Sequence, residues 1–156
     1  MREMRLRNEK LVDITAYCLM PNHIHLLLKQ LLPNGISRFL ANTQNSYTKY
    51  FNTKHDRTGP LFLDQFKAVR VESDEQLVHL TRCIHLNPIT SYLIKDFSDL
   101  LSYPWSSLPE YITEEDICST TIIMSSFKKK EAYLNFLEDQ VDYQRTLKLI
   151  EHILHE

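Results

Sequence analysis

The sequence predicts an α+β fold, in which helices pack on a mainly antiparallel sheet. Two apolar runs, residues 11–20 and 23–30, are separated by Pro21-Asn22, as in two strands joined by a tight turn. Two later segments instead carry apolar side chains at helical spacing. An extended stretch over residues 60–71 separates these segments. The order strand, strand, helix, strand, helix is typical of the α+β class.

The second strand carries two histidines one residue apart. Because strand side chains alternate between faces, His23 and His25 are predicted to project together. Ile24, Leu26 and Leu28 would project to the other face, where they can be buried. A sheet built this way holds two imidazoles side by side while its back packs on a core.

The first helix is predicted to begin at Ile36, after the turn formed by Pro33-Asn34-Gly35. Its apolar stripe predicts a core-facing side that includes Tyr47 and Tyr50. A polar loop over residues 52–59 follows the helix. The full stripe consists of Ile36, Phe39, Leu40, Thr43, Tyr47, Tyr50 and Phe51.

The second helix begins at a recognisable cap. Ser73 is a favoured N-cap residue, and the acidic residues that follow it suit the positive end of a helix dipole. Pro88 predicts that the helix ends near Asn87. Side chains four residues apart share one helical stripe, so His79, Cys83 and Asn87 are predicted to lie on one face.

Composition limits the class of protein. A chain of 156 residues fits one domain, and no apolar run approaches the roughly 20 residues of a membrane span. Three widely spaced cysteines do not suggest a disulfide framework, which favours a reducing cytoplasm. Residues 1–95 hold 13 Lys/Arg and 8 Asp/Glu, whereas residues 96–156 hold 5 and 12. The basic front suits a polyanionic partner.

The histidine pair and Asn87 suggest a metal site. Two imidazoles and one amide oxygen leave coordination positions open for water and phosphate oxygens. Such a site suits Mg²⁺ or Mn²⁺ acting as a Lewis acid on a nucleic-acid phosphate. This reading requires the second helix to lie across the strand that carries His23 and His25.

The run Ala16–Leu27, read with five further blocks, resembles the single-tyrosine HUH transposases (His–hydrophobic–His). The branch it resembles is associated with repetitive extragenic palindromes. The blocks occur in family order between about residue 11 and residue 112, and together they are specific. They are Tyr47–Phe51, Arg57–Phe62, Phe66–Ala68, Ile84–Pro88 and Tyr103–Ser107.

The resemblance implies a fold, a chemistry and a partner. The fold is a ferredoxin-like or RRM-like core over residues 1–112, followed by an acidic helical extension over residues 113–156. Helices are expected at 117–127 and 131–152. His23, His25 and Asn87 match the family's ligands for a divalent metal. The family's tyrosine attacks single-stranded or hairpin DNA and becomes joined to the 5′-phosphate. A nucleoid-associated protein in a bacterial or archaeal cell is expected.

The chain departs from the family pattern at two places. Cys83 stands where the nucleophilic tyrosine belongs, in the segment Arg82–Pro88. A thiol is shorter than a phenol, so we expect cleavage by the usual route to be lost or severely reduced. About ten residues precede Leu11 where relatives carry roughly 40 more, so a sheet edge would be exposed and a homodimer is expected.

Three functions therefore stay open: a DNA-cutting transposase, a relative that binds DNA without cutting it, and a structural zinc protein. The zinc alternative would join His23, His25, Cys83 and His79 in a closed tetrahedral site. Both DNA alternatives predict basic side chains that contact phosphates. These candidates are Lys49, Lys54, Arg57, Lys67, Arg70 and Arg82.

Overall fold

The computed structural model describes residues 9–63, 66–113 and 117–146. The chain divides into two compact units. The α2 unit consists of residues 1–13 and 29–71, and the α3 unit consists of residues 14–28 and 72–156.

The predicted hairpin is present. Strand β1 (Val12–Leu19) pairs with β2 (Ile24–Gln30) in a two-stranded antiparallel sheet, and Met20 N donates to His23 O at 2.9 Å across the turn. The predicted burial was wrong in one respect. Leu27, on the same face as His25, is buried, whereas Ile24 is 44% exposed. The buried side chain of β2, Leu27, thus lies on the face of the strand that carries His25 and not on the opposite face.

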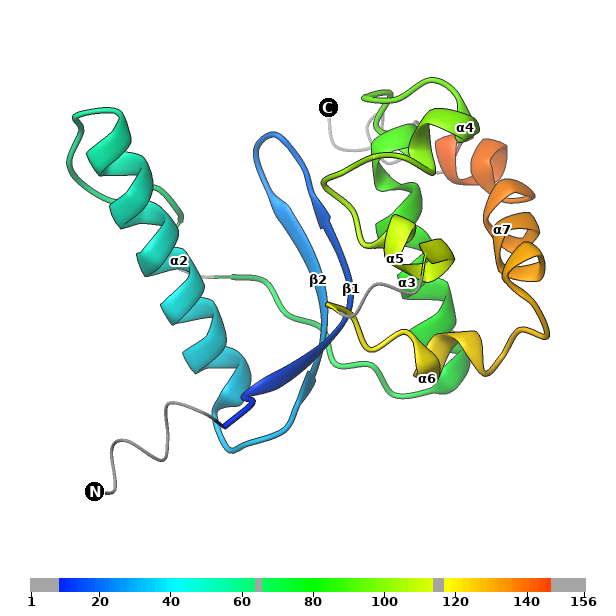
Figure 1. Ribbon diagram of the computed structural model, residues 1–156, viewed down its shortest axis with the longest axis horizontal. Helices are drawn as coiled ribbons and strands as arrows, with labels where there is room; N and C mark the ends of the chain where they lie inside the picture. Colours follow the sequence, from blue (N-terminus) through cyan, green and yellow to red (C-terminus); the bar gives the residue numbers. More distant parts are fainter. Residues whose placement is uncertain (1–8, 64–65, 114–116, 147–156) are drawn as a thin grey trace. The chain divides into compact units, whose positions relative to one another are not determined.

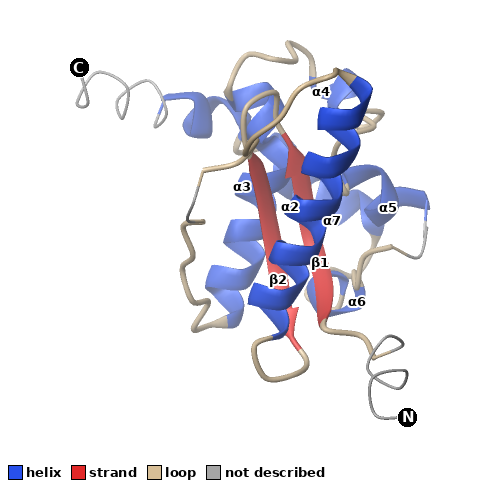
Figure 2. Ribbon diagram, turned by 90° about the vertical axis from the view of Figure 1, so that its left-hand side faces the viewer, coloured by secondary structure: helices blue, strands red, loops and turns tan. Residues whose placement is uncertain are grey.

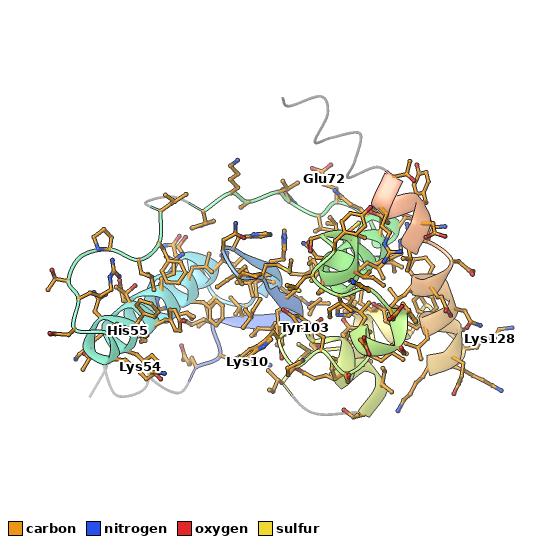
Figure 3. The ribbon with its side chains drawn as sticks, turned by 90° about the horizontal axis from the view of Figure 1, so that it is seen from above. Lys10, Lys54, His55, Glu72, Tyr103 and Lys128 are labelled. Atoms are coloured by element: carbon orange, nitrogen blue, oxygen red, sulfur yellow. The ribbon has the colours of Figure 1, made fainter. Side chains whose placement is uncertain are left out.

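In the α2 unit, helix α2 (Gly35–Lys54) follows the predicted turn, in which Asn34 has φ 57°. Gly35 is required because a Cβ atom there would collide with the backbone carbonyl of Leu11. Lys54 and His55 mark the other end of the helix (Figure 3).

The strand expected over residues 60–71 is absent from the described residues of that segment, which form bends and irregular backbone. Most of these side chains are exposed, including Phe66 and Val69. A strand needs a hydrogen-bonding neighbour, and the observed sheet pairs only β1 with β2. The aromatic and β-branched composition of the segment was therefore a misleading signal.

In the α3 unit, helix α3 (Asp74–Thr90) begins where predicted, and Ser73 Oγ accepts from Gln76 N at 3.2 Å. The predicted end near Asn87 was wrong, because the helix continues through Pro88 to Thr90. Pro88 lies in the last turn, so its missing N–H removes a single intrahelical bond. The Asn87 carbonyl oxygen accepts from Ser91 N at 2.9 Å, which closes the helix end.

The remaining helices of the α3 unit are short. They are α4 (Phe97–Leu100), α5 (Leu108–Thr113), α6 (Thr121–Met124) and α7 (Lys130–Glu138), and residues 141–146 are also helical. The helix expected over 117–127 is thus confined to α6. The helix expected over 131–152 is interrupted at residues 139–140, and positions 147–152 lie outside the described residues.

Helix α3 lies between the hairpin and α7, as Figures 1 and 2 show. One apolar core joins α3 to the helices that follow it. Residues on both sides of the predicted boundary at 112 contribute to this core: Leu86, Ile89, Leu100, Leu108, Tyr111, Ile123, Tyr133, Leu137 and Val141. Among the described residues, we find no helix with the length and apolarity needed to span a bilayer.

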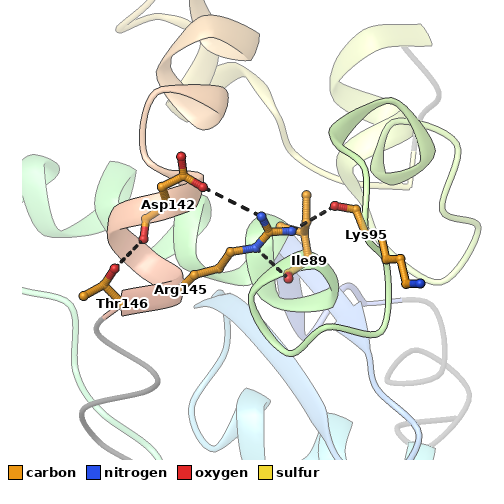
Figure 4. A network of polar contacts seen from close by, with 5 residues as sticks. All are labelled: Ile89, Lys95, Asp142, Arg145 and Thr146. Atoms are coloured by element: carbon orange, nitrogen blue, oxygen red, sulfur yellow. Dashed lines mark hydrogen bonds and ion pairs between the residues drawn. The ribbon is translucent and has the colours of Figure 1, made fainter.

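Arg145 anchors the last described helical turn to the end of α3 (Figure 4). Its guanidinium donates to Lys95 O at 2.9 Å and to Ile89 O at 3.5 Å. Asp142, whose side chain is 98% exposed, lies 3.7 Å from the same guanidinium. The anchor therefore depends mainly on backbone carbonyls.

Candidate functional site

The two histidines of the hairpin converge. His23 Nε2 lies 3.0 Å from His25 Nε2, and the two rings are nearly perpendicular, at 87°. His23 comes directly before β2 and is exposed, whereas His25 lies within the strand and is half-buried. The tight turn at Pro21-Asn22 thus brings both imidazoles together at the turn end of the hairpin.

Asn22 orients the first imidazole. Its Oδ1 lies 2.7 Å from His23 Nδ1, and an amide oxygen only accepts, so His23 Nδ1 carries the proton. The Nε2 lone pair of His23 is then directed toward His25. This arrangement, an imidazole fixed through its second nitrogen, is the common device for orienting metal-binding histidines.

The nitrogen separation fits one shared cation. Two nitrogen ligands about 2.1 Å from a metal and at right angles to each other lie about 3.0 Å apart. The two Nε2 atoms lie at hydrogen-bond distance, 3.0 Å, so a cation bound by both would replace a proton shared between the rings. The donor set therefore suits a six-coordinate divalent metal with positions left for oxygen ligands.

Asn87 belongs to the same unit as the histidines, and it is 7% exposed near the end of α3. Its backbone is held firmly, because its carbonyl oxygen accepts from both the N and the Oγ of Ser91. The role of its side-chain oxygen as a third ligand stays a prediction.

Cys83 lies in a polar chain on α3. Arg82 Nη2 donates to His79 Nδ1 at 2.7 Å, so the proton of the neutral His79 ring is on Nε2. That Nε2 lies 3.5 Å from Cys83 Sγ, which lies 3.8 Å from Gln144 Oε1. Burial, followed by the charge of Arg82, lowers the pKa of His79. His79 thus donates to the sulfur and does not act as its base.

His85, to which the sequence assigned no role, is wholly buried in a second polar chain. Its Nδ1 lies 2.7 Å from Tyr133 Oη, and its Nε2 lies 2.8 Å from Ser107 Oγ. Ser107 Oγ in turn accepts from Tyr17 N at 2.9 Å. These contacts join α3 to α7 and to β1. Burial lowers the pKa of His85 to about 3, so the ring is neutral.

Glu110 forms a second buried contact between β1 and the helices. Its carboxylate accepts from Tyr17 Oη at 2.9 Å and from Cys118 N at 2.8 Å. Burial, and after it the charge of Glu110, raises the pKa of the Cys118 thiol to about 12. The thiol of Cys118 is consequently protonated and unreactive at neutral pH.

The six basic candidates differ in how their charges are engaged. The Arg57 guanidinium donates to Asn52 Oδ1 and to Pro60 O, and it orders the loop after α2. The Arg82 guanidinium lies 4.5 Å from the centre of the Phe136 ring. The remaining four side chains are exposed: Lys49, Lys54, Lys67 and Arg70.

The closed zinc site is not formed in the structure. Within the described residues, no group of three or more histidine, cysteine, aspartate or glutamate side chains is placed to hold a metal. His23 pairs with His25, whereas Cys83 pairs with His79 on α3.

Comparison with known families supports the resemblance seen in the motifs. Residues 4–86 match the family model described as "Transposase IS200 like". Comparisons with curated proteins and with solved structures gave no match. The matched segment covers more than half of the chain, and it includes the histidine pair and Cys83. The chain is therefore a member of the IS200-like transposase family.

Proposed function

We propose that this protein binds hairpin-forming single-stranded DNA at a divalent metal site, and that it has lost or nearly lost the strand cleavage of its family. The observation that carries the proposal is the convergence of His23 and His25 at 3.0 Å within a transposase-family domain. The family implies DNA processing, and the histidine pair of β2 would supply two ligands for the metal that such processing uses.

The three proposed ligands are His23, His25 and Asn87, and the proposed ion is Mg²⁺ or Mn²⁺. When bound, the ion would polarise a phosphate oxygen of the DNA. The chain's own contribution is positioning. Asn22 fixes the ring of His23, and Ser91 holds the backbone of Asn87.

Cys83 accounts for the proposed loss of cleavage. Its sulfur accepts from His79 Nε2 and lies 3.8 Å from Gln144 Oε1, so both contacts would have to be displaced before the sulfur could approach a phosphate. A cysteine side chain also ends several ångströms short of where a tyrosine oxygen would reach. The protein would then hold DNA and metal without forming the covalent 5′-phosphate link.

The decisive experiment restores the nucleophile. The Cys83→Tyr variant, with Gln144→Ala to make room for the ring, is incubated with 5′- and 3′-labelled hairpin DNA and Mn²⁺. We expect nicking and a covalent protein–DNA adduct from this double variant, and retarded but intact DNA from the wild type. The Gln144→Ala variant alone serves as the matched control and should not cut.

Metal binding is tested separately by Mn²⁺ titration followed by electron paramagnetic resonance. One site per chain is expected in the wild type, with affinity reduced 10- to 100-fold in His25→Gln, roughly the loss typical of a perturbed metal site. Efficient nicking by the wild type with attachment at Cys83 would overturn the non-cutting proposal. One tightly held zinc without any Mn²⁺ response would overturn the metal assignment.

A homodimer, formed through an exposed sheet edge, is part of the proposal. The described edge of β1 already receives contacts, since Ser107 N donates to Tyr17 O at 3.0 Å and Ser119 N donates to Ile14 O at 2.7 Å. Pairing would therefore use β2. A monomeric mass by light scattering across the micromolar range would argue against it.

A further inference from the structure

Two tyrosines predicted to face a core are exposed on α2. Tyr50 is 58% exposed and Tyr47 is 48% exposed. An aromatic ring left in water is costly unless something covers it in use, since burying such a ring is a main source of binding energy. The tyrosines therefore mark a candidate contact surface in the α2 unit.

The rings are supported from within the α2 unit. Tyr47 lies 6.1 Å from Phe51 and 6.0 Å from Phe62, measured between ring centres. Tyr50 lies 6.4 Å from Tyr47. Tyr47 is thus packed on one side by other rings, while Tyr50 stands at the outer end of this aromatic row.

Basic and hydroxyl side chains surround the outer ring. Lys54 Nζ lies 5.6 Å from the centre of the Tyr50 ring, at the end of α2 shown in Figure 3. A shallow, open hollow of about 540 Å³ lies against this helical face. It is lined by Ser46, Lys49, Tyr50, Thr53 and Lys54.

The positive charge of α2 favours a negatively charged partner. Helix α2 contains Arg38, Lys49 and Lys54 and has no acidic residue. A nucleic-acid strand fits this surface, because lysine ammonium groups bind phosphates and a tyrosine ring stacks on a base. Duplex DNA hides its base faces, so the strand must be unpaired.

We propose that this face of α2 is a stacking site for unpaired DNA, in which Tyr50 stacks on a base while Lys49 and Lys54 contact the adjacent phosphates. The inference rests on the proposed DNA-binding function and adds to it a separate contact for single-stranded DNA. In this arrangement the Tyr47 ring supports the Tyr50 ring from the inner side of the aromatic row. The metal site is not required for the stacking.

The test compares two labelled strands of equal length, oligothymidylate and an abasic strand with the same sugar–phosphate backbone. Fluorescence anisotropy with the full chain measures both affinities. We expect the wild type to prefer the thymidine strand by roughly 5- to 100-fold, the range for one stacked base. Tyr50→Ala should abolish most of this preference, and Tyr50→Phe should keep it.

The lysines should behave differently from the tyrosine. Lys49→Gln and Lys54→Gln should weaken both strands equally and reduce the salt dependence of binding. Tyr143→Ala is the matched control, because Tyr143 is also 58% exposed but belongs to the α3 unit. That variant should bind both strands as the wild type does.

Two outcomes would overturn the stacking site: equal wild-type affinity for the two strands, or displacement of DNA by an acidic peptide at similar concentration. A Tyr50→Phe variant that behaves like Tyr50→Ala would also do so, since the ring would then not be the contact. If the wild type binds hairpin DNA but has equal affinity for the thymidine and abasic strands, only this inference fails. If no DNA binds at all, the proposed function fails as well.

Discussion

Helices α2 and α3 are similar in length but bury their side chains very differently. Of the 20 residues of α2 only Gly35 is buried, whereas α3 buries eight of its 17. Helix α3 carries Cys83 and Asn87, and it is fixed by a core on one side and by the His85 chain on another. The burial of α3 fits its proposed role of holding chemical groups in place, and the exposure of α2 fits its proposed role of presenting side chains to DNA.

The largest expected difference between the helices comes from a matched truncation. Leu86→Ala in α3 removes a wholly buried side chain and should lower the free energy of unfolding by about 2–5 kcal/mol. Leu40→Ala in α2 removes a half-buried one and should cost clearly less. Urea denaturation followed by circular dichroism measures both. Equal losses would show that α2 is as firmly packed as α3.

A smaller effect should follow from removing one hydroxyl. Tyr133→Phe leaves His85 Nδ1 buried without its partner, so a loss of about 1–3 kcal/mol in stability is expected. Tyr50→Phe on α2 removes an exposed hydroxyl and should be nearly neutral. Thermal denaturation of the two variants gives the comparison. A neutral Tyr133→Phe would contradict the structural role assigned to the His85 chain.

Alkaline pH should weaken the α3 unit through Cys118. In the unfolded chain a thiol ionises near pH 9, whereas burial raises the pKa of folded Cys118 to about 12. Because the folded state resists losing this proton, stability should fall as pH rises above 9, by up to about 1.4 kcal/mol per pH unit. In the Cys118→Ala variant, the free energy of unfolding should fall less steeply between pH 9 and 10 than in the wild type. Parallel wild-type and variant curves would refute the assignment.

The smallest expected effects concern the helix starts. Ser73→Ala removes the cap of α3 and should cost about 1 kcal/mol. Asn34, before α2, makes no side-chain capping bond and has φ 57°, which glycine adopts without strain. Asn34→Gly should therefore be neutral or slightly stabilising in urea denaturation. A loss comparable to that of Ser73→Ala would mean that Asn34 has a contact beyond its backbone conformation.

The sequence was sufficient where local chemistry decides the structure. The hairpin turn at Pro21-Asn22, the turn at Pro33-Asn34-Gly35 and the cap at Ser73 each depend on residues within a few positions, and each was predicted. The convergence of His23 and His25 is of the same kind, because strand alternation and one turn place both rings.

The sequence did not predict the features that depend on contacts with residues far away along the chain. His85 reaches Tyr133, 48 residues away, and Ser107, 22 residues away, so no local pattern marks it as buried. Tyr47 and Tyr50 fit a helical stripe, but a stripe predicts burial only if another element covers it. Pro88 suggested a helix end, yet tertiary packing around Leu86 and Ile89 carries α3 one turn further.

Arg145 has a practical consequence for measuring DNA affinity. Its bonds to the carbonyl oxygens of Ile89 and Lys95 pair a cation with uncharged dipoles, and dissolved ions screen such short contacts far less than they screen surface charges. Raising the salt concentration should therefore release DNA from the proposed lysine contacts, while the last described helical turn stays bound to α3. The slope of affinity against salt would then report phosphate contacts alone, undistorted by detachment of the acidic end of the protein.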